Sequence, residues 1–496
     1  MSPRMLLLTF LAAITLLRWV LIAPGDLSPE DAYAALCGFT AAVATFDGPA
    51  ATSICVAWGT MLGGSSALGA ALLWPLFAAF ATLALYLLVK PVAGRPAAYG
   101  AAVLLNLLPA FNNAALAPSN ALPLAMLSTA FLACAWRALD NDSVPWWISA
   151  GLCAGAALLF TYAAWFLLPA LALVLLLSHR WRRQLLKPGF WLSIFPALGV
   201  FGLLLAWNAS HGWVHFIDGT LQTATTLQWG RLPGGLLAAT VGLSPLVFAA
   251  LIAGLAFAAS LIRIAPKAKF LTIPALVALL LTVYAVLQGR DAETPGLVAI
   301  ALLLPLLAWL PPTVGRYSLT LVFVSAAIWT ASMIALRPAH APSLTPEVVR
   351  EIERLRRAES APITTPAFLI AENAPLASIL ALHLPNASFV LPGHPPVYVP
   401  ESPYPDSQYA LWPRYDQFVD AQSVPQEADD DPYTEQDGTN PFIGRSALYV
   451  TTQSPEQLPQ SISAAFSSWR LLAEIVTPSG QILRIYLCSD YETLPL

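Results

Sequence analysis

Long apolar runs follow one another from Met5 to about Leu336, separated by short polar segments. Many approach the roughly 20 residues that an α-helix needs to cross a bilayer. The pattern predicts eleven membrane-spanning helices, at residues 5–23, 67–89, 97–111, 121–139, 146–161, 164–178, 189–208, 235–262, 270–288, 295–310 and 317–336. The fifth and sixth are divided only by Thr161, Tyr162 and the turn that follows, so their boundary is the weakest.

The first apolar run has the character of a secretory signal peptide. Residues 6–21 are almost entirely apolar, but no small-residue cleavage motif follows them cleanly. Since the run also fits the series of spans, we expect a retained membrane anchor.

The pattern changes after Arg337, where acidic runs, proline-rich turns and alternating apolar positions begin. It predicts helices at residues 346–358, 374–384 and 459–469, strands at 387–391, 447–451, 471–477 and 481–488, and a mobile insertion at 422–440. We therefore expect a mainly α fold of two domains. Residues 1–336 form a polytopic helical membrane domain with a first outer loop at 24–66, and residues 337–496 form a soluble mixed α/β domain.

Composition excludes several classes of protein. The chain of 496 residues is 57% hydrophobic and only 10% charged, with a mean hydropathy of +0.66. A soluble domain carries about 25% charged residues, so a single soluble domain and a disordered chain are both excluded. The net charge of -4 argues against a nucleic-acid partner, which would be bound through a basic surface.

The basic residues predict the orientation of the membrane domain. With the N-terminus in the cytoplasm, the outer loops contain only Arg231 and Arg290. The inner segments contain twelve basic residues: Arg4, Lys90, Arg95, Arg137, Arg180, Arg182, Arg183, Lys187, Arg263, Lys267, Lys269 and Arg316. Because Lys and Arg are retained on the cytoplasmic side, an odd number of spans places the C-terminal domain outside, in a periplasm or its equivalent.

The first outer loop is acidic, with Asp26, Glu30, Asp31 and Asp47 and no basic residue. Carboxylates beside a membrane mark function when a cavity holds them, although a solvated acidic loop explains the composition equally well.

An ordered series of short motifs resembles the GT-C class of membrane glycosyltransferases, the relatives of protein mannosyltransferases and aminoarabinose transferases. In the membrane domain, the motifs are residues 27–33 (LSPEDAY), 45–49 (TFDGP), 151–177, 207–214 (WNASHGWV) and 242–245 (GLSP). In the outer domain, they are residues 391–395 (LPGHP), 407–413 (SQYALWP) and 447–450 (ALYV). The series covers nearly the whole chain in the order of the family.

The resemblance implies transfer of a sugar from a polyprenyl-phosphate donor to an envelope glycan, lipid or protein, at the outer face of a bacterial inner membrane. An acidic residue of the first loop takes the acceptor proton in this family, which points to Glu30 by position and to Asp31 as its partner or as a group facing a divalent cation. The implied substrate-binding residues are Asp47, Tyr162 and His211. Arg290 is a further candidate, because it lies close to the departure at Ala292 and can supply a positive charge from a different position. Asp47 is equally explained as a turn residue before Pro49, and His211 as part of an interfacial aromatic belt.

Three family positions lack the expected polar residue, which keeps a second hypothesis open. Ser119 stands where the family has a carboxylate, Thr161 where it has a lysine before Tyr162, and Ala292 where it has a histidine. The alternative is a catalytically degenerate GT-C protein that acts as a subunit or scaffold beside a membrane protein partner. The partners of the enzyme are instead membrane lipids and the lipid-linked sugar donor.

Cysteine and histidine spacing predicts no metal site. His211 and His215 are four residues apart but have no third ligand at a compatible spacing. Among the five cysteines, Cys37 and Cys55 can pair within the first outer loop. The chain has no phosphate-binding loop of a nucleotide enzyme, which fits a lipid-linked donor.

Overall fold

The computed structural model describes residues 3–221, 227–262, 264–310, 315–335, 344–360, 366–384, 393–402, 405–417, 440–453 and 458–492. The chain divides into two compact units. The first consists of Met1–Pro24 and Gly38–Pro338, and the second of Gly25–Cys37 and Ala339–Leu496. A short part of the expected outer loop is therefore grouped with the C-terminal residues.

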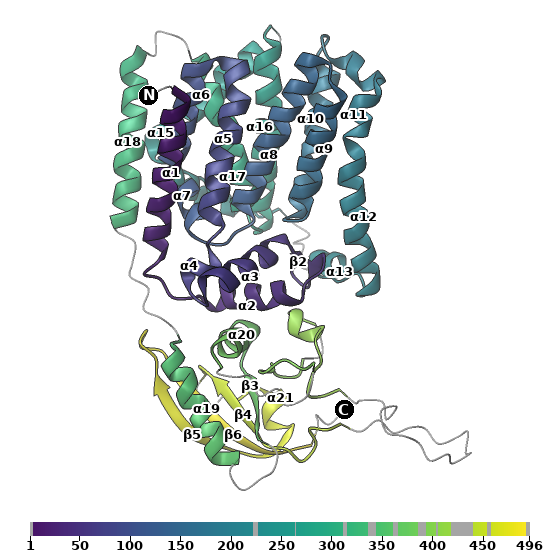
Figure 1. Cartoon of the computed structure of the whole chain (residues 1–496), viewed down its shortest axis with the longest axis vertical. Helices are drawn as coiled ribbons and strands as arrows, with labels where there is room; N and C mark the ends of the chain where they lie inside the picture. The colour runs from purple at the N-terminus through teal and green to yellow at the C-terminus, as the bar shows by residue number, and fades with distance from the viewer. Residues whose placement is uncertain are drawn as a thin grey trace, which may run out of the picture. The chain divides into compact units, whose positions relative to one another are not determined.

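The first unit consists mainly of apolar helices, coloured purple to green in Figure 1. They are α1 (Pro3–Ile22), α5 (Trp74–Ala93), α6 (Arg95–Asn106), α7 (Pro109–Leu116), α8 (Ala121–Asn141), α9 (Val144–Leu158), α10 (Leu167–Leu177), α11 (Pro188–Leu192), α12 (Ile194–Ser210), α14 (Leu232–Leu243), α15 (Pro245–Leu261), α16 (Pro266–Gln288), α17 (Glu293–Leu303) and α18 (Gly315–Ala335). Helix α8 lies at the centre of the packing, against α5, α9 and α17.

Several of these helices are long and apolar enough to cross a membrane. In the described residues there are five: Met5–Ile22, Ala67–Ala93, Ala121–Asn141, Pro188–Ser210 and Pro266–Gln288. The bent pair α14–α15 makes six, and shorter apolar helices such as α9 and α17 accompany them. These helices support a multi-pass membrane protein, while the number of eleven spans stays a prediction.

Proline explains the breaks within two of the predicted spans. The span 235–262 is bent by 105° between α14 and α15. Ser244 at the bend has φ 77°, and Pro245 begins the next helix. The span 97–111 breaks where Leu108 is extended before Pro109. Because proline disfavours helical geometry in the residue before it, each helix ends there.

The boundary between the fifth and sixth predicted spans is confirmed as a break. Helix α9 ends at Leu158, and the 3₁₀ helix η1 (Tyr162–Phe166) precedes α10. Thr161 is extended, and its hydroxyl accepts a hydrogen bond from the Ala163 amide at 3.2 Å. The hydroxyl thus caps η1, and Thr161 marks the start of this 3₁₀ helix.

The expected outer loop 24–66 is largely helical. It contains α2 (Pro29–Thr40), strands β1 (Ala44–Thr45) and β2 (Gly48–Pro49), and α3 (Ala51–Gly63), followed by the short α4 (Ala67–Ala70). The two strands form an antiparallel hairpin in which Thr45 pairs with Gly48. This hairpin lies beside α13 (Val214–Leu221) in Figure 1.

The second unit contains a four-stranded mixed sheet with the order β3-β4-β6-β5. The strands are β3 (Phe368–Ala371), β4 (Ala447–Thr451), β5 (Phe466–Val476) and β6 (Ile482–Tyr491). Strands β3 and β4 are parallel, and the other pairs are antiparallel. Helices α19 (Pro346–Ser360) and α20 (Ala374–His383) accompany the sheet, whose core is rich in Tyr and Phe.

The structure corrects one predicted element of this unit and adds a strand. Residues 459–469 form only the short helix α21 (Gln460–Ser463), because Phe466 already begins the long strand that pairs with β6. Strand β3 was not predicted. The expected strand at 387–391 and nearly all of the expected insertion at 422–440 lie outside the described residues.

Candidate functional site

The first acidic motif begins helix α2. The Ser28 hydroxyl accepts a hydrogen bond from the Asp31 amide at 3.0 Å, and the Ser28 carbonyl accepts one from the Ala32 amide at 2.9 Å. With Pro29 in the first helical position, this is the sequence pattern of a helix N-terminus. Glu30 and Asp31 therefore lie in the first turn, where the helix dipole favours carboxylates.

Asp31 is half-buried, and burial raises its pKa to about 6. The hydrogen bond from the Ser28 side chain opposes this rise, and the negative charge of Glu30 adds to it. A carboxyl group with a pKa near 6 is largely ionised at neutral pH, yet it is a stronger base than an ordinary aspartate. These are the properties that a general base requires.

Glu30 is exposed and lines a cavity of about 200 Å³ in the second unit. The other lining residues are Pro29, Leu344, Asn373, Pro375, Leu376, Thr452, Gln481 and Leu483. The amide and hydroxyl groups among them can hydrogen-bond to a polar ligand beside the carboxylate.

A hydrogen-bonded cluster in the first unit joins four elements around His215. Its Nε2 lies 2.6 Å from the Thr45 carbonyl oxygen, and its Nδ1 lies 2.8 Å from the Tyr162 hydroxyl and 3.0 Å from Asn208 Nδ2. Because a carbonyl can only accept, Nε2 carries the proton and Nδ1 accepts from Tyr162 and Asn208. Burial lowers the pKa of His215, which favours this neutral tautomer.

His211, the predicted substrate ligand, lies outside this cluster. Its ring stacks on Trp207 with centroids 4.1 Å apart, and its Nδ1 lies 2.9 Å from the Trp207 carbonyl oxygen. His215 stacks on the same indole at 5.0 Å. The sequence pattern had placed His215 only in a weak metal pair with His211. Spacing gave no signal for His215, because a turn at residues 211–213 separates it, at the start of α13, from Asn208 in the last turn of α12.

Asp47 lies in the two-residue turn of the β1–β2 hairpin and is exposed. Its negative charge raises the pKa of His215, against the larger effect of burial. Asp47 thus occupies a turn and also acts electrostatically on the cluster around His215. The turn role and the functional role expected for it are therefore compatible.

Arginines occupy two further places in the first unit. Arg290 follows the C-terminus of α16, and Arg231 of η3 (Trp229–Arg231) lies against Gly289, where a Cβ atom would overlap its Nη1. Arg18 of α1 is buried and donates to Asn106 Oδ1 at 2.9 Å and to Asn112 Oδ1 at 2.8 Å. Asp291 and Glu293 directly follow Arg290, so acidic residues accompany the two arginines at the end of α16.

Of the three family positions without the expected residue, Thr161 has a structural role here, and so do the direct neighbours of Ser119 and Ala292. Thr161 caps η1, as described above. Asn120, next to Ser119, accepts a hydrogen bond from the Thr52 hydroxyl. Beside Ala292, Asp291 Oδ1 accepts from the Glu293 amide at 2.8 Å and caps α17.

Neither a metal cluster nor a disulfide is found in the described residues. No group of three or more His, Cys, Asp or Glu side chains could hold an ion there. All five cysteines are free thiols. Glu30 and Asp31 alone do not complete the ligand set of a divalent cation, so that expectation stays a prediction.

Comparisons with known proteins agree with this architecture. Residues 47–207 match the family model of dolichyl-phosphate-mannose-protein mannosyltransferases. The resemblance to the GT-C class of membrane glycosyltransferases is thereby confirmed. No curated protein is similar enough in sequence to count as a relative.

The fold is similar to that of ArnT from Cupriavidus metallidurans. The crystal structure of ArnT bound to undecaprenyl phosphate is similar at a TM-score of 0.59 and 17% identity, over 97% of each chain. The apo structure is similar at a TM-score of 0.57 and 17% identity, over 98% of each chain. The likeness covers both units, including the mixed sheet.

Proposed function

We propose that the chain is an integral membrane glycosyltransferase that takes its sugar from a polyprenyl-phosphate donor. The observation that carries this proposal is the likeness over almost the whole chain to ArnT in its complex with undecaprenyl phosphate. The match to the mannosyltransferase family supports the same reaction class, because that family is named for a lipid-phosphate sugar donor.

In the proposed reaction, an acceptor hydroxyl attacks the anomeric carbon of the donor. The new glycosidic bond forms as the bond from that carbon to the phosphate oxygen breaks, and polyprenyl phosphate leaves with an additional negative charge. Asp31, and not Glu30 as expected by position, is proposed to take the acceptor proton, and its raised pKa supports this role. Glu30 lies beside it in the first turn of α2 and helps to keep that pKa high.

The departing phosphate needs cationic or hydrogen-bonding groups, and the first unit offers both. We propose Arg290 for the phosphate, supported by its place after the C-terminus of α16, where Arg231 lies against the neighbouring Gly289. Tyr162 and Asp47, through the cluster around His215, are proposed to orient the sugar. His211 is proposed to line its path by stacking with Trp207. The acceptor is an envelope glycan, lipid or protein at the periplasmic face of a bacterial inner membrane.

The test uses membranes that contain the full chain and a set of radiolabelled polyprenyl-phosphate sugars. Because a general base contributes roughly 10²–10⁴ in rate, the combined change Glu30→Gln and Asp31→Asn should reduce transfer at least about 100-fold. The matched control is Asp26→Asn, a carboxylate of the same acidic segment that is exposed and precedes α2. It should retain transfer.

Membrane insertion and binding of undecaprenyl phosphate should be unchanged in the double variant. Transfer at the wild-type rate in that variant would contradict the assignment. A folded, inserted wild-type chain that transfers no sugar from any donor would instead favour a degenerate scaffold, the alternative raised by Ser119, Thr161 and Ala292.

A further inference from the structure

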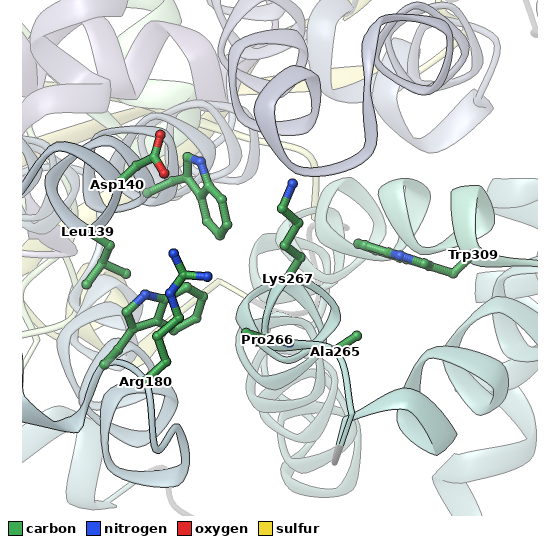
Figure 2. A pocket seen from close by; sticks show the side chains of 9 residues that line it. Leu139, Asp140, Arg180, Ala265, Pro266, Lys267 and Trp309 are labelled. Atoms are coloured by element: carbon green, nitrogen blue, oxygen red, sulfur yellow. The ribbon is translucent and has the colours of Figure 1, made fainter.

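A second cavity lies at the other end of the helices of the first unit, away from the proposed chemistry. It has a volume of about 290 Å³, close to the lower limit of about 300 Å³ for small-ligand sites. Figure 2 shows it between the end of α8, the turn before η2 (Arg182–Leu186), the start of α16 and the end of η4 (Leu304–Trp309). Its lining residues are Trp136, Leu139, Asp140, Arg180, Trp181, Ala265, Pro266, Lys267 and Trp309.

Two cations and one carboxylate face this cavity. Figure 2 shows the guanidinium of Arg180 and the ammonium of Lys267 on its two sides, with Asp140 at its edge. Lys267 Nζ donates to the Pro91 carbonyl at 3.3 Å. Within the described ranges, none of the ion pairs involves Arg180, Lys267 or Asp140. The cavity therefore has an excess of one positive charge that no described side chain neutralises.

An independent observation comes from Trp136, on the wall of the same cavity. This side chain is only 5% exposed, and its ring packs edge-on against Trp181 and Phe270. In the part of the chain that is described, its buried Nε1–H donates to no acceptor. Because buried polar groups are almost always hydrogen-bonded, this N–H calls for an acceptor supplied from outside the chain.

The neighbouring groups indicate where that acceptor comes from. Lys187 forms an ion pair with Asp142 at 2.5 Å, and Lys269 Nζ donates to the Leu177 carbonyl at 2.6 Å, so basic residues gather at this end of the helices. Indole rings such as those of Trp181 and Trp309 are typical of the headgroup level of a membrane. By the distribution of charge, this is the cytoplasmic end.

We propose that this cavity binds the headgroup of an anionic phospholipid. A phosphodiester carries one negative charge, which neutralises the excess, and its oxygens accept hydrogen bonds from Arg180, Lys267 and the Trp136 indole. Asp140 accepts a hydrogen bond from a headgroup hydroxyl, which favours phosphatidylglycerol over phosphatidylcholine. Basic pockets between membrane helices on the cytoplasmic side bind anionic headgroups in this way.

The test measures lipid binding to the purified full chain in detergent, by native mass spectrometry and by thermal stability during lipid titration. The wild type should retain phosphatidylglycerol and gain stability from it, but not from phosphatidylcholine. The combined change Arg180→Ala and Lys267→Ala should weaken binding roughly tenfold or more, because each basic residue contributes to attraction of the headgroup. Trp136→Phe keeps the ring but removes the N–H, and should weaken binding several-fold.

The matched control is the combined change Arg182→Ala and Arg183→Ala, which removes two exposed charges from the same segment but not from the cavity. It should bind as the wild type does. Equal losses in the two double variants would show a general charge effect and overturn the proposal. Stabilisation by soluble glycerol phosphate at the lipid's own concentration would overturn the lipid source.

Discussion

Asp31 has a structural role at the start of α2 and a proposed catalytic role through its side chain. Its backbone amide completes the start of α2 through Ser28, which makes the position structurally favourable, while its side chain is buried enough to raise its pKa. Burial of a carboxyl group opposes ionisation, so the charge that the proposed chemistry needs has a cost in stability.

The charge of Asp31 should therefore destabilise the fold in a pH-dependent way. Its folded-state pKa of about 6 exceeds the ordinary value of 3.8, so the folded chain binds more protons between these values and stability falls as the pH rises through them. Above pH 6 the cost is complete, at most about 3 kcal/mol. Asp31→Asn should raise the thermal midpoint at pH 7.5, leave it unchanged near pH 4, and abolish transfer.

The comparison for this prediction is Glu347→Gln, an exposed carboxylate in the first turn of α19. Its thermal midpoint should follow that of the wild type at both pH values. If Asp31→Asn has the same midpoint as the wild type at pH 7.5, the raised pKa is incorrect.

At the residue scale, the sequence points to candidate segments but does not show which side chains contact one another. Residues 207–214 were recognised as a motif, yet the residue that binds Tyr162 is His215, one position beyond it. The choice depends on which imidazole faces η1 and the β1–β2 hairpin. Spacing along one helix cannot show this, because the hydrogen-bonding groups come from three other parts of the chain.

At the scale of elements, most apolar runs did become helices, since the length and apolar character of a run are local properties. The breaks at Ser244 and Leu108 were not predicted. Pro245 and Pro109 follow them directly, but a prediction from hydropathy alone takes no account of the effect of proline on a helix. Residues 466–469 were assigned to a helix, but their pairing with β6 overrides local preference.

Close helix packing depends on glycine at particular positions. Gly151 of α9 faces the start of α12, and a Cβ atom there would lie 2.2 Å from the Ser193 carbonyl oxygen. Since that neighbour is backbone, the helices would have to move apart. Gly151→Ala should lower the thermal midpoint by roughly 3 °C or more, as expected for overpacking by 1–3 kcal/mol.

The control for this prediction is Gly199→Ala on α12, where a Cβ atom would meet nothing within 4 Å. That change should leave the midpoint unchanged or raise it slightly, because alanine favours a helix more than glycine does. Equal effects of the two substitutions would contradict the packing argument.

At the scale of the whole molecule, the distribution of Lys and Arg predicts sidedness without any three-dimensional information. The structure brings Lys187 to Asp142 and Lys269 to Leu177, so residues expected in the cytoplasm do lie together. The grouping of Gly25–Cys37 with the C-terminal residues was not foreseen, because it depends on contacts between segments more than 300 residues apart.

Cysteine labelling checks the predicted topology. In a cysteine-free background, Gln228→Cys and Ser479→Cys should react with an impermeant maleimide in intact spheroplasts, since both positions are exposed and expected outside. Arg183→Cys should react only after the membrane is permeabilised. The reverse labelling pattern would indicate the opposite orientation, in which the proposed site does not lie in the periplasm.

Strand β5 forms the outer edge of its sheet, and over its 11 residues only β6 pairs with it in the described structure. Trp469, Leu471 and Val476 along it are exposed. An open, partly apolar edge strand can pair with a strand of another molecule, and charged side chains on the edge make this pairing unfavourable. Arg470 and Glu474 act as such gatekeepers, each held in an ion pair. Replacing both with neutral residues should therefore favour pairing of β5 with a strand of another molecule.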